Sequence, residues 1–518
     1  ISRNHAAMDK GLMPWWALEK LKVSFWRPLS ELTHGFDYKL WPNNAVMMHI
    51  HNVLLFVLVI LLLFTLYRKL QIPPWVAGLA ALLYVIDDAR AIPVSWLANR
   101  NAILAVFFGI ATIIFHHRWR SENDRILMIA APLVFILAML SGESAIATTA
   151  YLFAYCLFID SKTVKSRFLS LVPYGVVVVG WWFIYSSNNF GAFGSNAYID
   201  PGSEPMRFFG NMVTNSPILL FIQFGFLPTI LGGMLLQGSG VGLVVIISII
   251  FIIAIVLLLL PVLKENKVAR FLCIGMLLSV LPISSTSPGE RLLWFVGIGG
   301  MGLLALMFEY WLDKSNITKL ATLKRITFKL MLAILLFIHF IISPILFVFN
   351  SQSNSIMSKL LDSVYKSELW KPESDKQQTI LVNGFFHWFN VSSMRIAEKK
   401  PLAKHVRLLS TGDEVTEFKR LSENQLLVTC KHGFFSTPMP KMLRSHAYPL
   451  KKGDVIKLTG FSAEIKKLHK SKQPLQVLYT FTNGINNYKF LQIEKNQLKI
   501  FSLPKVGTSI VLEKMKIL

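Results

Sequence analysis

Long apolar segments recur along the chain from residue 46 to about residue 350. Val53–Leu66 and Val241–Leu260 are two of the longest. A helix needs about 20 mostly apolar residues to cross the hydrocarbon core of a bilayer. The pattern therefore predicts an all-α polytopic membrane domain with about 10–11 spans. The ten spans expected within the chain cover residues 46–67, 73–87, 101–117, 125–141, 143–160, 166–186, 242–263, 268–286, 291–312 and 324–349.

Lysine and arginine gather in alternate loops between these spans. The clusters are Arg68 and Lys69; Arg118, Arg120 and Arg125; Lys162, Lys165 and Arg167; Lys264, Lys267 and Arg270; and Lys314, Lys319, Lys324 and Arg325. Such clusters are typical of cytoplasmic loops. The other loops and the region after residue 350 are then extracytoplasmic. We expect a multi-pass protein of a bacterial inner (plasma) membrane with its C-terminal domain outside the cytoplasm.

The segment 204–238 affects the count of spans. Its apolar run, Ile218–Leu236, is interrupted at Gly225, Pro228 and Gly232-Gly233. If this run crossed the membrane, every later basic cluster would move to the outer side. We therefore interpret the segment as a re-entrant or surface-lying hairpin on the outer side, with a full crossing as the alternative. Non-helical backbone at membrane depth is tolerated where it lines a cavity, so such a hairpin can border a site.

The sequence divides into four regions. Residues 1–45 form the first extracytoplasmic loop, and we expect a further span upstream of Ile1. Residues 46–350 form the multi-span domain, and residues 351–376 form a linker with helical character. Residues 377–518 alternate short apolar runs with turn residues, which predicts a small β-rich domain.

Composition supports a membrane protein. Of the 518 residues, 53% are hydrophobic and 16% are charged, whereas soluble domains carry about 25% charged residues. The net charge of +24 is explained by the basic loops. Because no RNA- or DNA-binding module is visible, we expect no nucleic-acid partner. The expected partner is membrane lipid.

The unusual polar residues fall on the extracytoplasmic side. Ionisable groups at the edge of a membrane are candidates for function. Those selected are Arg27, Asp87, Asp88, Trp96, Arg100, Glu143, Glu290 and Arg291. Asp87 and Asp88 can cap a helical turn, act as a general base or hold a divalent cation. Trp96 suits either a membrane interface or a site. No Cys/His spacing typical of a zinc site is present.

Four motifs resemble those of GT-C-type membrane glycosyltransferases, in particular bacterial relatives of the transmembrane TPR-bearing protein O-mannosyltransferases. The first is Trp26-Arg27-Pro28-Leu29 with Phe36-Asp37-Tyr38 and His49-x-x-Asn52, which resembles the family's "RPL … H-x-x-N" segment. The second is Pro93-Val-Ser-Trp96-Leu-Ala-Asn99-Arg100-Asn101, similar to "AVAWISGRND". Leu140-Ser141-Gly142-Glu143 is similar to "LSKE", and Glu290-Arg291-Leu292 to "ERYLYLP". They occur in the family's order and lie within about residues 25–310.

The resemblance implies a function. A polyprenyl-phosphate-linked sugar would be transferred, with inversion, to an envelope glycan, lipid or protein on the outer face of the membrane. Arg291 would contact the lipid phosphate, Glu143 would line the site, and Arg27 and Arg100 would brace the first loop.

The chain departs from the family in three places. The family's acid stands early in the first outer loop, so we expect it upstream of Ile1, with Asp9, Asp37 and Asp88 as substitutes and Asp88 preferred. Gly142 replaces the lysine of "LSKE". TPR repeats are absent from the sequence. The alternatives are an enzyme similar to O-antigen ligases or polymerases, and a non-catalytic scaffold or transporter that presents the β-rich domain.

Overall fold

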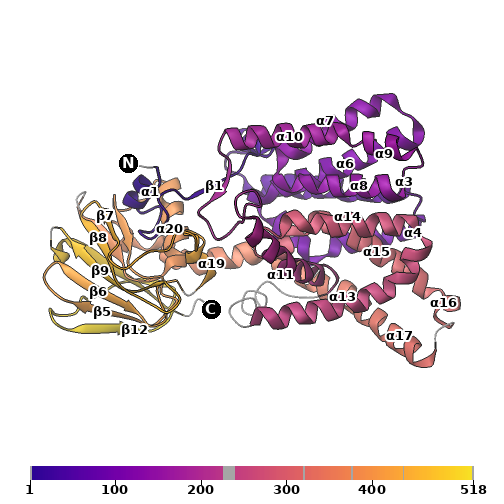
Figure 1. The fold of residues 1–518 in the computed structure, drawn as a ribbon. Coiled ribbons are helices and arrows are strands. Elements are labelled where there is room, and N and C mark those ends of the chain that lie inside the picture. Colours follow the sequence, from indigo (N-terminus) through magenta and orange to yellow (C-terminus); the bar gives the residue numbers. More distant parts are fainter. Residues whose placement is uncertain are drawn as a thin grey trace. The chain divides into compact units, whose positions relative to one another are not determined.

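The computed structural model describes residues 3–225, 240–318, 321–374, 377–435, 437–482 and 484–515. These residues form two compact units (Figure 1). The helical unit comprises residues 24–191 and 199–354, and the β-rich unit comprises residues 1–23, 192–198 and 355–518. Two short strands, β1 (Lys22–Ser24) and β2 (Gly191–Phe193), lie where the chain passes from one unit to the other.

The helical unit contains a helix at each of the ten predicted spans. These are α3 (Ala45–Lys69), α4 (Pro74–Ile86), α6 (Arg100–Glu122), α7 (Arg125–Ser141), α8 (Thr148–Phe158), α10 (Val172–Ser187), α13 (Gly240–Glu265), α14 (Lys267–Ile283), α15 (Trp294–Leu312) and α17 (Thr322–Phe337) continued by α18 (Ser343–Ser351). Within the described ranges, six helical segments are long and apolar enough to cross a membrane. The prediction of a membrane-embedded helical domain is thus supported by the length and composition of the helices.

Shorter elements connect these helices. They are α2 (Pro28–Leu40), η1 (Asp88–Arg90), α5 (Ala91–Ser95), η2 (Leu97–Asn99), η3 (Glu143–Ala147), α9 (Val164–Leu169), α11 (Pro205–Phe224), η4 (Glu290–Leu292), α16 (Lys314–Thr318) and the π-helical turn η5 (Ile338–Ile342). Most of them lie in the loops that lack lysine clusters, and these loops carry the selected polar residues.

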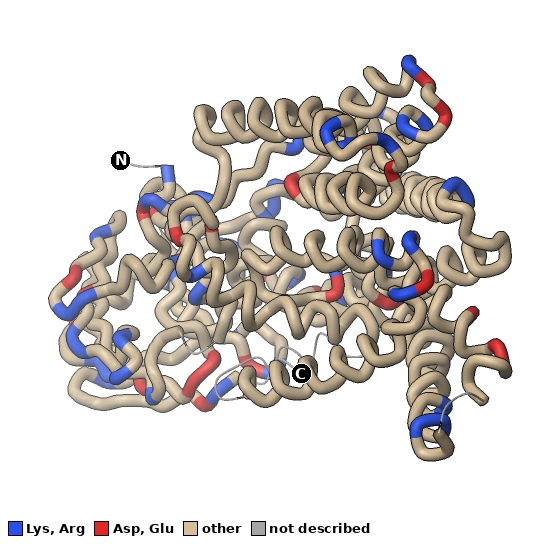
Figure 2. The backbone as a smooth tube through the Cα atoms, turned by 45° about the vertical axis from the view of Figure 1, so that its right-hand side comes forward, with Lys and Arg blue, Asp and Glu red and all other residues tan. Residues whose placement is uncertain are grey.

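The loops gather at two opposite ends of the helical unit. At one end, Lys69 Nζ lies 2.9 Å from Glu122 Oε1, and Lys162 Nζ donates to Asn123 Oδ1 over 2.8 Å. We call this the lysine-rich end, and Figure 2 shows lysine and arginine (blue) at several helix ends there. We call the other end the carboxylate end, because Asp87, Asp88, Glu143 and Glu290 belong to its loops. The alternation predicted from loop charge thus corresponds to two ends of one helical bundle.

Helix α11 remains at the carboxylate end. Asn215, in its middle, donates to the carbonyls of Ser284 and Thr286 over 3.2 and 3.0 Å, and Gln223, near its end, bonds to Asp87. Since both contacts are to loops of the same end, the first part of the segment 204–238 does not run across the bundle. The remainder of the expected hairpin, residues 226–238, lies outside the described residues.

Helix α15 is the central helix of the unit, and nearly all of its residues are buried. Tyr67 and Tyr151 donate to its Ile298 and Phe295 carbonyls over 2.6 Å each, and Tyr84 donates to the Trp294 carbonyl over 2.9 Å. The glycines of α15 permit this close packing. A Cβ added to Gly302, for example, would lie 2.8 Å from Leu272 Cδ1. Residues at the start of α15 are therefore held in fixed positions beneath the carboxylate end.

The β-rich unit contains two sheets. One has the strand order β11-β10-β3-β4, with β3 parallel to both β10 and β4, and the other is antiparallel with the order β12-β5-β6-β9-β8-β7. The strands are β3 (Gln378–Leu381), β4 (Val406–Leu408), β5 (Thr416–Arg420), β6 (Gln425–Cys430), β7 (Val455–Leu458), β8 (Phe461–Leu468), β9 (Pro474–Phe481), β10 (Tyr488–Glu494), β11 (Gln497–Ile500) and β12 (Ser509–Leu512). Helix α20 (Phe385–Ala397) connects the parallel strands β3 and β4. The expected β-rich region is thus confirmed.

Other helices complete the β-rich unit. They are α1 (Arg3–Lys10), α19 (Ser353–Lys366), which begins in the helical unit, η6 (Glu368–Trp370), α21 (Pro438–Lys441) and η7 (Ile485–Asn487). Helix α19 occupies much of the predicted linker 351–376.

The N-terminal segment differs from the single loop expected over residues 1–45. Residues 1–23 pack within the β-rich unit, whereas α2 belongs to the helical unit. Trp15 and Trp16 are buried in the core of the β-rich unit, and Trp16 Nε1 donates to the Pro440 carbonyl over 3.3 Å. The physical reason is the hydrophobic effect, because packing two tryptophan side chains into this core removes a large apolar area from water.

Candidate functional site

Asp87 and Asp88 lie where α4 ends and the turn η1 begins. The backbone leaves the helical region at Asp87, with φ −67° and ψ 122°, and the Asp87 side chain accepts from the backbone N–H of Ala89 over 3.1 Å. Capping of this kind satisfies an N–H group that the turn leaves unpaired. Asp87 therefore has the capping role that the sequence suggested as one alternative.

Asp87 also belongs to a buried polar network. Its Oδ2 accepts from Gln223 Nε2 over 3.2 Å and lies 3.4 Å from Arg90 Nη2. The Arg90 side chain is fully buried, and its guanidinium lies 4.3 Å from the centroid of the Tyr84 ring and 5.2 Å from that of Trp294. These contacts orient the turn η1.

Gly297 makes room for the Arg90 side chain. A Cβ on Gly297 would lie only 2.1 Å from Arg90 Nη2. Arg90 can therefore pack against α15 only because residue 297 has no side chain. This close contact fixes η1 against the central helix.

Asp88 is held differently, by Ser343. The Ser343 hydroxyl donates to Asp88 Oδ1 over 3.0 Å and accepts from the Asp88 backbone N–H over 2.9 Å. Burial raises the pKa of Asp88 well above its usual value, and the charges of Asp87 and Glu290 raise it further, while the bond from Ser343 opposes them. A carboxyl with a raised pKa is suited to exchange protons near neutral pH.

The π-helical turn η5 directly precedes Ser343. π-helical turns are rare and are found often at functional sites. Here the turn contains the buried His339, whose Nε2 lies 3.1 Å from the Phe224 carbonyl oxygen. The turn thus connects α11 with the segment that bonds to Asp88.

Glu290 and Arg291 form the turn η4, which packs against η1. Glu290 is buried, whereas Arg291 is exposed. Across the described ranges, Arg291 makes no hydrogen bond or ion pair. An exposed guanidinium beside buried carboxylates is free to bind an external anion, and its geometry suits a phosphate.

Arg27 and Glu143 form a second group of contacts at the carboxylate end. Arg27 Nε donates to Glu143 Oε2 over 2.7 Å, and the two side chains are 30% and 25% exposed. Glu143 Oε1 is buried and accepts no hydrogen bond from the described residues. The pair connects the start of α2 to η3.

Arg100 anchors α2 and α3 from the start of α6. Its Nη2 lies 2.5 Å from Asp37 Oδ2, and its Nε donates to Asn52 Oδ1 over 2.7 Å. It also donates to the carbonyls of Thr33 and Met48. The Arg100 and Asp37 side chains are 0% and 1% exposed. Arg100 therefore has a positioning role for the first loop.

Asp37 and Asp9 were the other two acids considered as substitutes for the catalytic acid. Both already form ion pairs with arginine. Burial acts to raise the pKa of Asp37, but the hydrogen bonds from Arg100 and His51 outweigh it and hold the pKa below its usual value. Asp9 lies in the β-rich unit, where burial likewise acts to raise its pKa but Thr459 and Arg407 lower it. Of these three acids, Asp88 is the one whose pKa is raised.

The structure thus places the selected residues in two groups. Asp87, Asp88, Glu290 and Arg291 lie on the packed turns η1 and η4, and Arg27, Arg100 and Glu143 belong to the contacts of α2. Trp96 stands between α5 and η2, 41% exposed. No hydrogen bond or ion pair joins the two groups within the described ranges.

Three site residues were not identified from the sequence, namely Gln223, His339 and Ser343. His339 had a signal, because an ionisable residue within an apolar run is a candidate for function. Nothing in the sequence around Gln223 or Ser343 indicated a functional role.

Among the described residues, no group of three or more His, Cys, Asp and Glu side chains is arranged to hold a metal ion. Comparison of the chain with protein-family models gives no match, and neither does comparison with curated proteins.

Proposed function

We propose that this protein is an inverting membrane glycosyltransferase that transfers a sugar from a polyprenyl-phosphate donor to an envelope acceptor. The observation that carries the proposal is the pair of packed turns η1 and η4. They bring a carboxyl of raised pKa, Asp88, to the same end of the helical unit as the exposed Arg291. A base and a phosphate-binding cation are the two groups that this reaction requires.

Asp88 acts as the general base in the proposed reaction. Its carboxylate takes the proton of an acceptor hydroxyl, and the acceptor oxygen forms a bond to the anomeric carbon. The bond from that carbon to the phosphate oxygen breaks on the opposite face, so the configuration inverts. Polyprenyl phosphate leaves with the electron pair, and the Arg291 guanidinium stabilises its negative charge.

The other polar residues of the carboxylate end position the loops or contact the sugar. The Asp87–Arg90 pair orients η1, and Arg100 holds the first loop. Glu143, which is held by Arg27 and is 25% exposed, lines the sugar site. The exposed ring of Trp96 supplies an apolar face of the kind that packs on sugar rings.

Replacing Arg291 by alanine tests the proposed donor contact. A hydrogen bond to a charged group contributes about 1.5–3 kcal/mol, so the KM for the polyprenyl-phosphate sugar should rise about 10- to 100-fold. The assay is release of polyprenyl phosphate by the purified full chain in lipid nanodiscs. Lys39, an exposed cation of α2, provides the matched control, and Lys39→Ala should leave the KM unchanged.

Two outcomes of this assay would contradict the proposal. Turnover with a polyprenyl-pyrophosphate donor alone would favour an enzyme similar to O-antigen ligases or polymerases. No turnover with any donor and acceptor, together with an unchanged envelope glycan in cells that carry the Arg291→Ala variant, would favour the scaffold.

The pH dependence tests the role of Asp88 through its neighbours. A general base is inactive when protonated, so kcat/KM should fall as pH decreases through the pKa of Asp88. Glu290→Gln removes a charge that raises this pKa, so the decline should move to lower pH. Ser343→Ala removes a bond that lowers the pKa, so the decline should move to higher pH. If the pH profiles of Glu290→Gln and Ser343→Ala shifted in the same direction, Asp88 would be excluded as the titrating group.

A further inference from the structure

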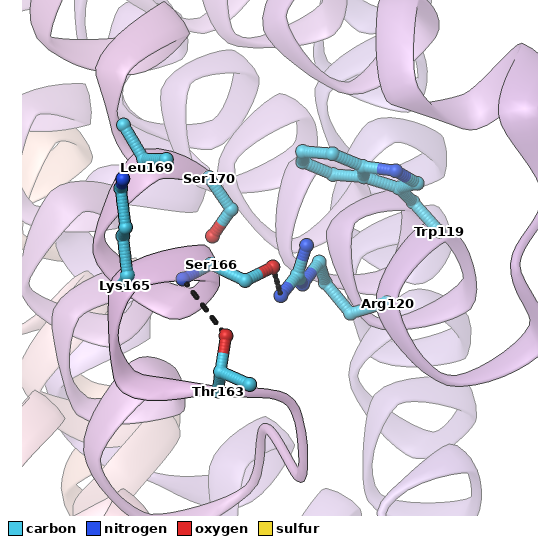
Figure 3. A pocket seen from close by; sticks show the side chains of 7 residues that line it. All are labelled: Trp119, Arg120, Thr163, Lys165, Ser166, Leu169 and Ser170. Carbon is cyan, nitrogen blue, oxygen red and sulfur yellow. Dashed lines mark hydrogen bonds between the residues drawn. The ribbon is translucent and has the colours of Figure 1, made fainter.

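A cavity of ≈ 310 Å³ lies at the lysine-rich end of the helical unit. Figure 3 shows that the end of α6 and the helix α9 with its flanking residues supply its walls. Trp119 and Arg120 come from α6, and Lys165 comes from α9. None of these residues belongs to the carboxylate end, so the cavity is separate from the site proposed above.

Arg120 gives the cavity a fixed cation. Its Nε donates to Asp160 Oδ2 over 2.7 Å. Its Nη2 donates to Ser166 Oγ over 3.0 Å, as Figure 3 shows. The Arg120 and Asp160 side chains are 6% and 1% exposed. These bonds leave Nη1 without an acceptor in the part of the chain that the structure describes. The guanidinium is therefore held rigidly with donors to spare.

Lys165 adds a second cation that no acid neutralises. Its side chain is exposed, and the described residues offer it no hydrogen bond or ion pair. The one buried acid beside Arg120 is Asp160, so the lining retains a net positive charge. An anion is the ligand that this charge favours.

Hydroxyl groups surround the two cations. Thr163, Ser166 and Ser170 all line the cavity (Figure 3). Hydroxyls donate to the oxygens of a phosphate, and arginine binds phosphate through its planar array of donors. The combination suits a phosphate group, because Arg120, Lys165 and the hydroxyls of Thr163 and Ser166 can all donate to its oxygens, whereas the Ser170 hydroxyl already donates to the Arg167 carbonyl.

The surface beside the cavity is apolar. Val164, Phe168 and Leu169 on α9 are 66%, 44% and 56% exposed. Helix α9 begins a membrane-span candidate, Val164–Ser187, whose apolar 18-residue window is only 11% buried. Exposed apolar side chains next to lysine are typical of an element that lies at a lipid–water interface. An element of this kind would bring the cavity close to phospholipid headgroups.

We propose that this cavity binds the phosphate group of an anionic phospholipid at the lysine-rich end of the protein. Arg120 and the hydroxyls of Thr163 and Ser166 hold the phosphate oxygens, Lys165 supplies the second cation, and the apolar face of α9 contacts the acyl chains. The same lining would accept free inorganic phosphate, so the test separates these two sources.

The test compares phosphatidic acid with diacylglycerol of the same acyl chains, using native mass spectrometry of the full chain. Phosphatidic acid should be retained and diacylglycerol should not. A lysine near an acidic lipid contributes about a fivefold gain in binding, so Lys165→Ala should weaken retention about fivefold, and Lys165→Arg should preserve it. Lys267→Ala removes an exposed lysine of the same end that does not line this cavity and should have no effect.

Three results would overturn the proposal or its lipid source. Equal retention of diacylglycerol would show that the phosphate is not recognised. Equal losses for Lys165→Ala and Lys267→Ala would show attraction to the whole basic surface and not to the cavity. Lys165-dependent binding of inorganic phosphate, with phosphatidic acid retained no better than diacylglycerol, would assign the site to the free anion.

Discussion

Replacement of Asp88 by asparagine is expected to lower the rate of sugar transfer by about 10²- to 10⁴-fold, which is the usual contribution of a general base. Asparagine has nearly the same shape and still accepts the Ser343 hydroxyl proton that Asp88 Oδ1 accepts. It cannot take a proton from an acceptor hydroxyl. The measurement is kcat/KM for transfer by the purified chain in nanodiscs.

The Asp88→Asn variant should fold normally. Because the pKa of Asp88 is raised in the folded protein, the neutral form is favoured there, and stability declines as pH rises through that pKa. A neutral asparagine removes this cost, so the thermal midpoint should be unchanged or higher at neutral pH. Asp200→Asn, in an exposed loop of the helical unit, is the activity control. Full activity of Asp88→Asn would place the general base elsewhere.

The apolar periodicity of the sequence was enough to predict the helical unit. A span was predicted over residues 125–141, and α7 covers the same residues; α3 extends one residue before and two after the predicted span 46–67. Such runs predict helices well because a bilayer requires every backbone polar group to be bonded within the segment. The basic loops likewise predicted which helix ends lie together.

Contacts within the candidate site were harder to predict. Ser343 and Asp88 are far apart in sequence. The π-helical turn that positions Ser343 lies in an apolar run whose residues do not distinguish it from ordinary α-helix. Their pairing depends on how helices pack, which periodicity does not report.

The N-terminal segment shows the same limit. Trp15 and Trp16 were assigned to the outer loop as part of residues 1–45, which precede the first predicted span. Their burial in the β-rich unit depends on partners more than 400 residues later, including Pro440. Local sequence does not contain this information.

Loss of Arg100 is expected to have the largest effect on stability. Arg100 and Asp37 form an ion pair that is almost fully buried, with the two side chains 0% and 1% exposed. Removing one partner of a buried pair costs about 3–5 kcal/mol, and Asp37 would keep only its bond with the partly exposed His51. Arg100→Ala should therefore lower the free energy of unfolding by that amount, measured by denaturant titration in detergent micelles.

Arg27→Ala provides the comparison, because Arg27 and Glu143 also bond over 2.7 Å but are 30% and 25% exposed. Partly exposed pairs contribute about 0–1 kcal/mol, so this variant should unfold nearly as the parent chain does. If both variants lost the same stability, burial of the Asp37–Arg100 pair would not be the cause. If Arg100→Ala lost none, α2 would be held by its other contacts, and Arg100 would have no positioning role for the first loop.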